Sequence, residues 1–223
     1  MFGKKKVAML VAEFMGTFVL TSAVYAVLVE RLPALFVAGA AGATMGLVVL
    51  TIGSVSGAHI NPAVTLGLWS LQKIQTAQAA VFISVQFLGA AVAWRLNEYF
   101  TGATLSKLAT SAMDWRVFTA ELIGTLIFGF GIASAVYQEY KGLKLATTIG
   151  ASLALGILVA SVGGNGVLNP AVALGIRSWN TAYVTGPLLG SLIGMNLYAQ
   201  LFVTKQIAVK AQVVAKKPAK KRK

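Results

Sequence analysis

One motif occurs twice in this sequence, as Ile60-Asn61-Pro62-Ala63-Val64-Thr65-Leu66-Gly67 and as Leu168-Asn169-Pro170-Ala171-Val172-Ala173-Leu174-Gly175. The copies lie 108 residues apart, counted from Asn61 to Asn169. Asparagine caps helices through its side-chain oxygen, and proline suits the first helical position because it has no N–H to leave unpaired. The apolar pieces that follow, about 61–71 and 169–178, are too short to cross a bilayer. The pair therefore predicts two half-helices that enter a membrane and turn back.

The rest of the chain has the composition of a membrane protein. Of its 223 residues, 57% are hydrophobic and 11% are charged. Stretches long enough to cross a hydrocarbon core of roughly 30 Å lie at 7–29, 34–54, 76–96, 115–137, 144–162 and 180–203. The first stretch resembles a signal peptide in outline, but it is too long and has an internal copy, so we interpret it as a retained helix. The sequence predicts an all-α membrane protein with six transmembrane helices and two re-entrant half-helices.

A second motif repeats at the same offset. Ala12-Glu13-Phe14-Met15-Gly16-Thr17 recurs as Ala120-Glu121-Leu122-Ile123-Gly124-Thr125. A fixed offset over two motifs indicates an internal repeat, with copies at about 7–96 and 115–203 joined by an outside loop. Each copy holds three spans and one half-helix. Because three is odd, the second copy starts from the opposite membrane face, so the repeats are inverted and their common site is expected near the midplane.

The half-helices predict a particular chemistry at that site. Asn61 and Asn169 are expected to cap their helices while the amide NH2 groups point into a lumen. Two positive helix ends at one spot would disfavour cations and protons, whereas a neutral molecule with an acceptor oxygen could accept the amide hydrogens. The approaches 54–59 and 163–167 are expected to be non-helical and to expose carbonyls. An ordinary helix start is the alternative for one Asn-Pro pair, but two pairs at one offset disfavour it.

Few other residues suggest chemistry. Glu13 and Glu121 are ionisable groups within spans, where a proton relay is one interpretation. Their equivalent positions favour the other, in which each carboxylate braces a re-entrant loop by accepting backbone N–H groups. The single histidine, His59, cannot form a metal site because no other histidine and no cysteine exists to complete one. We expect no cofactor and no enzyme activity, since no nucleophile, base and acid come together.

Basic residues set the expected orientation. Lys4, Lys5, Lys6, Lys73, Lys141 and Lys144 fall on the same side as the lysine-rich tail, and fewer basic residues fall on the other side. The positive-inside rule then predicts a multi-pass protein of the cell membrane with both termini in the cytoplasm. A domain at 1–203 is expected to precede a disordered basic tail at 204–223. Nucleic acid is not an expected partner, because no aromatic residue accompanies those lysines.

These motifs together resemble the aquaporin and glycerol-facilitator family. The resemblance covers about 7–203 and includes Gln86 with Gly89, and Gly186-Pro187. It implies a homotetramer with one pore per subunit and a central constriction made by Asn61, Pro62, Ala63, Asn169, Pro170 and Ala171. It also implies pore-lining positions at Gly57, Ala58, His59 and Asn165, and loop bracing by Glu13 and Glu121.

One departure from the family pattern concerns the outer filter. The family normally places an arginine three residues after the second asparagine, and this sequence has Val172 there. The other filter positions fall on Ala41, Ile157 and Gly166, so the resemblance implies a wide, apolar outer mouth. Arg177 is not an expected stand-in, because it lies about 140° round and roughly 7.5 Å further along a helix than Val172. The aspartate usual in glycerol facilitators is also absent.

The expected function is a passive transmembrane channel for water or small uncharged solutes, in contact with the lipid bilayer. Two alternatives remain open. One is a non-conducting membrane scaffold of the same fold, which would need bulky side chains in the lumen, whereas Ala41 and Gly166 are small. The other is a leaky ion or proton channel, which Val172 in place of arginine favours.

Overall fold

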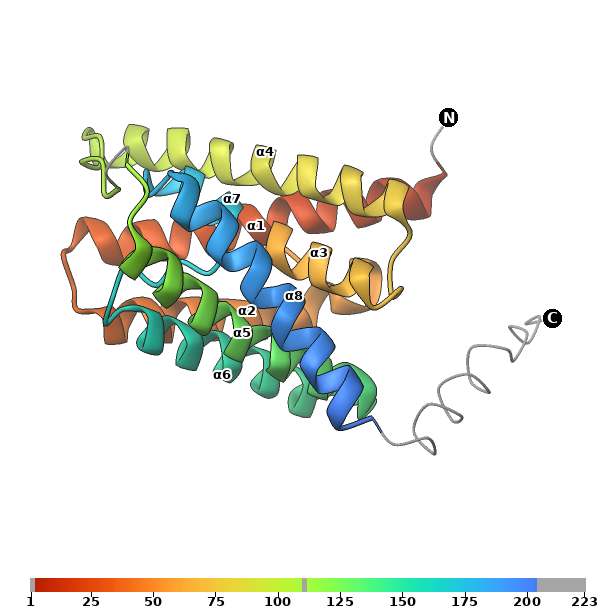
Figure 1. Cartoon of the computed structure of the whole chain (residues 1–223). Helices are drawn as coiled ribbons and strands as arrows, with labels where there is room; N and C mark the ends of the chain where they lie inside the picture. The colour runs from red at the N-terminus through yellow and green to blue at the C-terminus, as the bar shows by residue number, and fades with distance from the viewer. Residues whose placement is uncertain (1–2, 110–111, 204–223) are drawn as a thin grey trace.

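The chain folds as two similar groups of helices (Figure 1). The computed structural model describes residues 3–109 and 112–203, and within them it contains eight α-helices. Their bounds are α1 Lys4–Val29, α2 Ala34–Ser56, α3 Pro62–Ser70, α4 Thr76–Thr101, α5 Trp115–Tyr137, α6 Gly142–Ala160, α7 Pro170–Gly175 and α8 Thr181–Leu201. The order long, long, short, long occurs twice, which confirms the predicted all-helical arrangement. The predicted basic tail, 204–223, lies outside the described residues.

Two boundaries differ from the sequence prediction. Residues 54–56 were expected in the non-helical approach to the first half-helix, but α2 continues through Ser56. It ends at Gly57, whose φ of 97° is a left-handed conformation that glycine adopts readily. The second half-helix, α7, is shorter than the predicted 169–178, because the chain leaves helical geometry at Ile176 and Arg177 has a φ of 61°.

Five helices of the described part of the chain are long and apolar enough to cross a membrane, namely α1, α2, α4, α5 and α6. The sixth predicted span corresponds to α8, which has 21 residues but is less apolar because it contains Asn196, Pro187, two tyrosines and several glycines. Its place in the fold matches that of the sixth span: α8 packs along α5 as α4 packs along α1.

The two groups of helices enclose the half-helices between them. The start of α1 and the end of α8 lie at the same end of the molecule, while α3 lies toward that end and α7 toward the other (Figure 1). Helix α2 crosses α6 at Gly42 and Gly150, where a Cβ on Gly42 would lie 2.7 Å from the Gly150 carbonyl oxygen. Small residues allow this close approach, as is common between membrane helices.

Candidate functional site

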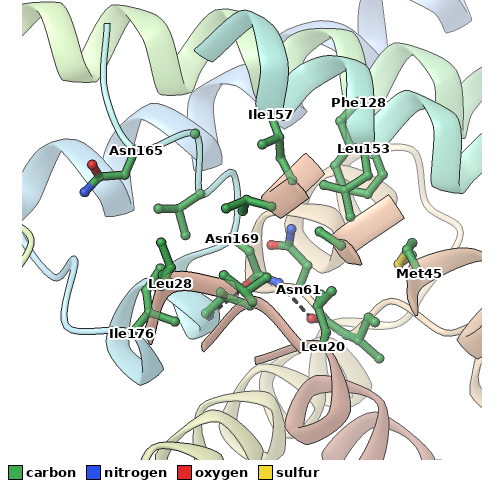
Figure 2. A pocket seen from close by; sticks show the side chains of 17 residues that line it. Leu20, Leu28, Met45, Asn61, Phe128, Leu153, Ile157, Asn165, Asn169 and Ile176 are labelled. Carbon is green, nitrogen blue, oxygen red and sulfur yellow. Dashed lines mark hydrogen bonds between the residues drawn. The ribbon is translucent and has the colours of Figure 1, made fainter. Parts of the chain in front are cut away.

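The N-termini of the half-helices meet in the interior. Asn61 caps α3 by accepting a hydrogen bond from the Ala63 amide at 2.8 Å, and Asn169 caps α7 through the Ala171 amide at 3.0 Å. Pro62 and Pro170 are the first residues of these helices. Figure 2 shows the two asparagine side chains close together in a cavity. The caps follow the chemistry expected of the Asn-Pro pairs.

The asparagine amides also bond across the two repeats, which sequence reasoning did not anticipate. Asn61 Nδ2 donates to the carbonyl oxygen of Leu168 at 2.9 Å, and Asn169 Nδ2 donates to that of Ile60 at 3.0 Å. Each accepting carbonyl belongs to the residue directly before the asparagine of the other repeat. An amide NH2 has two hydrogens, so each asparagine keeps a second N–H for another acceptor.

Ile60 and Leu168 adopt a backbone conformation that suits these bonds. Their φ angles are 41° and 55°, in the left-handed region that is uncommon for residues with a large side chain. In this conformation the Ile60 N–H donates to Glu13 at 2.7 Å and the Leu168 N–H donates to Glu121 at 2.7 Å. Each residue therefore links the glutamate of its own repeat to the asparagine of the other repeat.

The Ala-Glu-x-x-Gly-Thr motif of each repeat binds the loop that leads into the half-helix of that repeat, and we call this contact region the seat of the loop. In the first copy, Glu13 accepts the loop amides of His59 and Ile60, and a Cβ on Gly16 would collide with the Ile60 side chain. The Thr17 hydroxyl donates to the Glu13 carbonyl at 2.8 Å within α1. The second copy repeats this arrangement with Glu121, Gly124, Thr125 and Leu168. The glutamate holds the loop backbone, and the glycine makes room for the loop side chain.

The first seat has side-chain donors that the second lacks. Glu13 also accepts the Ser56 hydroxyl at 2.6 Å and the Gln86 amide at 2.8 Å. At the offset of 108 these two positions are Gly164 and Gly194, which have no side chain to donate. The Glu121 carboxylate accepts backbone amides, among them those of Val167 and Leu168.

His59 lies in the first loop beside this network. It is 7% exposed, its Nδ1 lies 3.3 Å from the Thr65 hydroxyl, and its ring meets the Phe82 ring edge to face at 5.4 Å. A Cβ on Gly57 would lie 3.1 Å from the imidazole, so that glycine makes room for the ring. Ala58 connects Gly57 to His59 and has a φ of 50°. The predicted pore-lining role of these residues stays a prediction.

The two asparagines line a cavity, with other lining residues on both sides of them (Figure 2). All four predicted outer-filter positions line it. Its full lining comprises Leu20, Val24, Leu28, Val37, Ala41, Met45, Ile60, Asn61, Phe128, Leu153, Ile157, Asn165, Gly166, Val167, Asn169, Val172 and Ile176. The three asparagines are its only polar side chains, so the cavity is apolar as expected.

The cavity is nevertheless not wide. Its volume is about 20 Å³, counted as the space that the centre of a water molecule can occupy. About 10–15 Å³ by that measure holds one water. Small residues at Ala41 and Gly166 do not make the cavity wide, because larger apolar side chains, among them Leu20, Phe128 and Leu153, also line it (Figure 2).

Residues 102–109 are bonded to the chain that follows α7. The Arg177 guanidinium donates to the Leu105 carbonyl at 2.6 Å, and the Arg177 carbonyl accepts the Leu108 amide at 3.0 Å. Arg177 is absent from the cavity lining, so its charge faces the outer segment and not the cavity. Ala109, in the same segment, is buried.

Comparison with known proteins shows which family this chain belongs to. The profile of the major intrinsic protein family matches residues 3–198. The chain belongs to the major intrinsic protein family. It is 31% identical over 207 residues to a probable aquaporin, NIP7-1, of Arabidopsis thaliana, covering 85% of this chain and 75% of that protein. It is 28% identical over 177 residues to the aquaporin AqpM of Methanothermobacter thermautotrophicus, covering 69% and 71%.

A solved structure shares the fold. The X-ray structure of the aquaglyceroporin from Plasmodium falciparum superposes with a TM-score of 0.71 at 22% identity, covering 92% of this chain and 99% of that one. This likeness confirms the predicted fold, and the family profile and the relatives above confirm the predicted membership of the aquaporin family.

Several cavity residues of this family member escaped sequence reasoning. Leu20, Val24 and Leu28 form one stripe of α1 at a spacing of four, a pattern that could have suggested one helix face. Phe128 and Leu153 carry no such signal, because apolar residues surround them on all sides of their helices. Among the described residues, no group of three histidine, cysteine, aspartate or glutamate side chains is placed to hold a metal ion.

Proposed function

We propose that this member of the family is a passive channel for water and small uncharged solutes, which cross between Asn61 and Asn169. The observation that carries the proposal is the meeting of two capping amides, one from each repeat, in the wall of an apolar cavity. Each amide keeps an N–H that can donate to a passing oxygen, while the remaining wall offers few competing partners. A solute therefore meets two fixed donors midway across the bilayer.

The same geometry accounts for the exclusion of ions in this proposal. An ion that enters a narrow apolar passage must give up hydration, at a cost of several kcal/mol that the lining must offset. Ala41, Ile157, Gly166 and Val172 form the outer filter in the proposal, and their side chains carry no charge or hydrogen-bonding group. Pro62, Ala63, Pro170 and Ala171 complete the central constriction. Glu13 and Glu121 brace the loops that carry both asparagines.

The proposal includes cytoplasmic termini, a cell-membrane location and a homotetramer. The chain has no cysteine, so an introduced thiol is the only one available for labelling. Ser106 and Glu139 are both exposed, in the segment after α4 and between α5 and α6. A membrane-impermeant maleimide added to intact cells should label Ser106→Cys and leave Glu139→Cys unlabelled. The reverse pattern contradicts the orientation.

Flux through reconstituted vesicles tests the transport function. Purified protein in liposomes, followed by stopped-flow light scattering, should shrink faster than empty vesicles under an impermeant osmolyte. Glycerol, urea and ammonia gradients in the same vesicles then identify the solutes that pass. Permeability equal to empty vesicles for water and every solute contradicts a channel and supports the non-conducting scaffold.

A proton leak is the second candidate function, and one observation favours it. Val172 occupies the filter position where the family has arginine, and the nearby Arg177 is bound to the Leu105 carbonyl. No cation among the described residues lines the cavity to repel a proton. Vesicles loaded with a pH-sensitive dye should acidify faster with protein than without if protons leak. Equal rates exclude this function.

A further inference from the structure

The outer end of the cavity has one polar side chain, that of Asn165. The other two polar residues of the lining are Asn61 and Asn169, which lie together deeper in the cavity (Figure 2). Figure 2 shows Asn165 apart from them, with apolar side chains between. A solute that enters from outside therefore meets the Asn165 amide before it reaches the apolar stretch.

Hydrogen bonds hold the Asn165 amide in one orientation. Its Nδ2 donates to the Ser178 hydroxyl at 3.0 Å and to the Leu108 carbonyl at 3.4 Å. Its backbone amide donates to the Tyr183 hydroxyl at 3.0 Å. Ser178 is fully buried, so the amide is fixed against a rigid part of the fold. Both side-chain N–H groups are used by these bonds, and the carbonyl oxygen Oδ1 keeps a lone pair for a further donor.

The outer segment contributes to this orientation. Leu108 supplies one acceptor for the Asn165 amide, and Leu108 is itself held by its bond to the Arg177 carbonyl. The Arg177 guanidinium fixes the same segment at Leu105. Arg177 is thus a positioning residue: it keeps Leu108 where it can bind Nδ2, which leaves Oδ1 exposed at the mouth.

We propose that Asn165 Oδ1 is a specificity-determining acceptor for uncharged solutes rich in N–H or O–H donors, such as urea and small polyols. This inference rests on the proposed channel function. A solute that enters the apolar stretch gives up hydrogen bonds to water, and the loss grows with its number of donors. A fixed acceptor at the entrance replaces one of those bonds. An arginine at the filter would offer hydrogen-bond donors to the solute. This mouth offers an acceptor, so it favours solutes that carry donors.

Paired permeability measurements test the proposal. Wild type, Asn165→Leu, Asn165→Ala and Ser178→Ala are reconstituted, and water, urea and glycerol permeabilities are measured in the same vesicles. Removing the acceptor should lower the urea-to-water and glycerol-to-water ratios by about 10-fold, the effect of about one good hydrogen bond. Ser178→Ala removes one acceptor of the Asn165 amide but leaves Asn165 itself in place. It should therefore lower both ratios by less. Val162→Leu is the matched control, because Val162 is 91% exposed, lies three residues away and does not line the cavity.

The outcomes separate this inference from the proposed function. Ratios that fall in both Asn165 variants and stay unchanged in Val162→Leu support the acceptor role. The acceptor role is overturned if both ratios stay unchanged in Asn165 variants that are correctly folded. Elution at the wild-type volume on size-exclusion chromatography shows that a variant is folded. A wild type that conducts water but neither urea nor glycerol also overturns it, while the water channel stands. A wild type that conducts nothing refutes both.

Discussion

The amide of Asn61 donates to the carbonyl oxygen of Leu168 at 2.9 Å, so each repeat holds the loop of the other. The reciprocal bond joins Asn169 to Ile60 at 3.0 Å. Both carbonyls belong to buried residues whose N–H groups are bound by Glu13 and Glu121. The junction of the half-helices is therefore a closed set of polar contacts in an apolar interior, and each member is costly to remove.

Asn61→Ala should destabilise the protein by about 2–4 kcal/mol. The variant loses a helix cap, worth about 1 kcal/mol, and leaves the buried Leu168 carbonyl without its donor, at about 1–3 kcal/mol. Denaturant unfolding in detergent measures the change. Ser84→Ala is the control, since the Ser84 hydroxyl makes only an exposed bond within α4. Equal stability of Asn61→Ala and wild type contradicts the role of this bond.

Glu13→Gln should destabilise the protein more than Glu121→Gln. A glutamine replaces one acceptor oxygen with an NH2 group, which then faces donors. Glu13 receives side-chain donors from Ser56 and Gln86 in addition to loop amides, so more bonds are at risk, each worth about 1–3 kcal/mol when buried. Thermal unfolding of both variants gives the ranking, and exposed Glu30→Gln serves as the reference. The opposite ranking shows that the second seat carries more of the stability.

The sequence was sufficient for the parts of this structure that follow from local rules. The offset of 108 pairs Asn61 with Asn169 and Glu13 with Glu121, and the structure brings each pair into equivalent contacts. Caps and proline positions depend on neighbouring residues alone, so the starts of α3 and α7 were predictable. Gly57 ends α2 later than expected because polar Ser54 and Ser56 do not themselves break a helix.

Long-range packing was not predictable in the same way. Nothing in the sequence indicates that Phe128 and Leu153 line the same cavity as Ala41, so its small volume could not be predicted from its small filter residues. The contacts of Arg177 with Leu105 and Leu108 join positions about 70 residues apart, and no motif marks them.

Gly190→Ala should destabilise the protein by about 1–3 kcal/mol, the usual cost of overpacking a close contact. A Cβ at Gly190 would overlap the carbonyl oxygen of Leu122 where α8 crosses α5. Gly39→Ala is the matched control in α2, because a Cβ there meets nothing within 4 Å. That variant should be neutral or more stable by about 0.5–1 kcal/mol through its helix preference. Similar effects of both substitutions on the unfolding midpoint contradict the close crossing.

Val172→Arg should lower the permeability to urea and glycerol and abolish any proton leak of the wild type. The new guanidinium would project into the apolar cavity beside Asn169, where it narrows the passage and repels cations. Solute flux and dye-reported proton flux are measured on the same vesicles, with Val162→Arg, at a fully exposed position just after the end of α6, as the charge control. A leak that persists in Val172→Arg shows that the protons do not pass this position.

Water flux through a graded cavity series tests the central claim most directly. Ala41→Val, Ala41→Leu and Ala41→Phe add volume to the cavity wall, and Leu47→Trp adds it on the exposed face of the same helix. The account predicts faster osmotic shrinkage of wild-type vesicles than of empty ones, a stepwise loss along the Ala41 series, and no loss in Leu47→Trp. Wild-type vesicles that shrink no faster than empty ones, or an Ala41 series that conducts as wild type does, would contradict it.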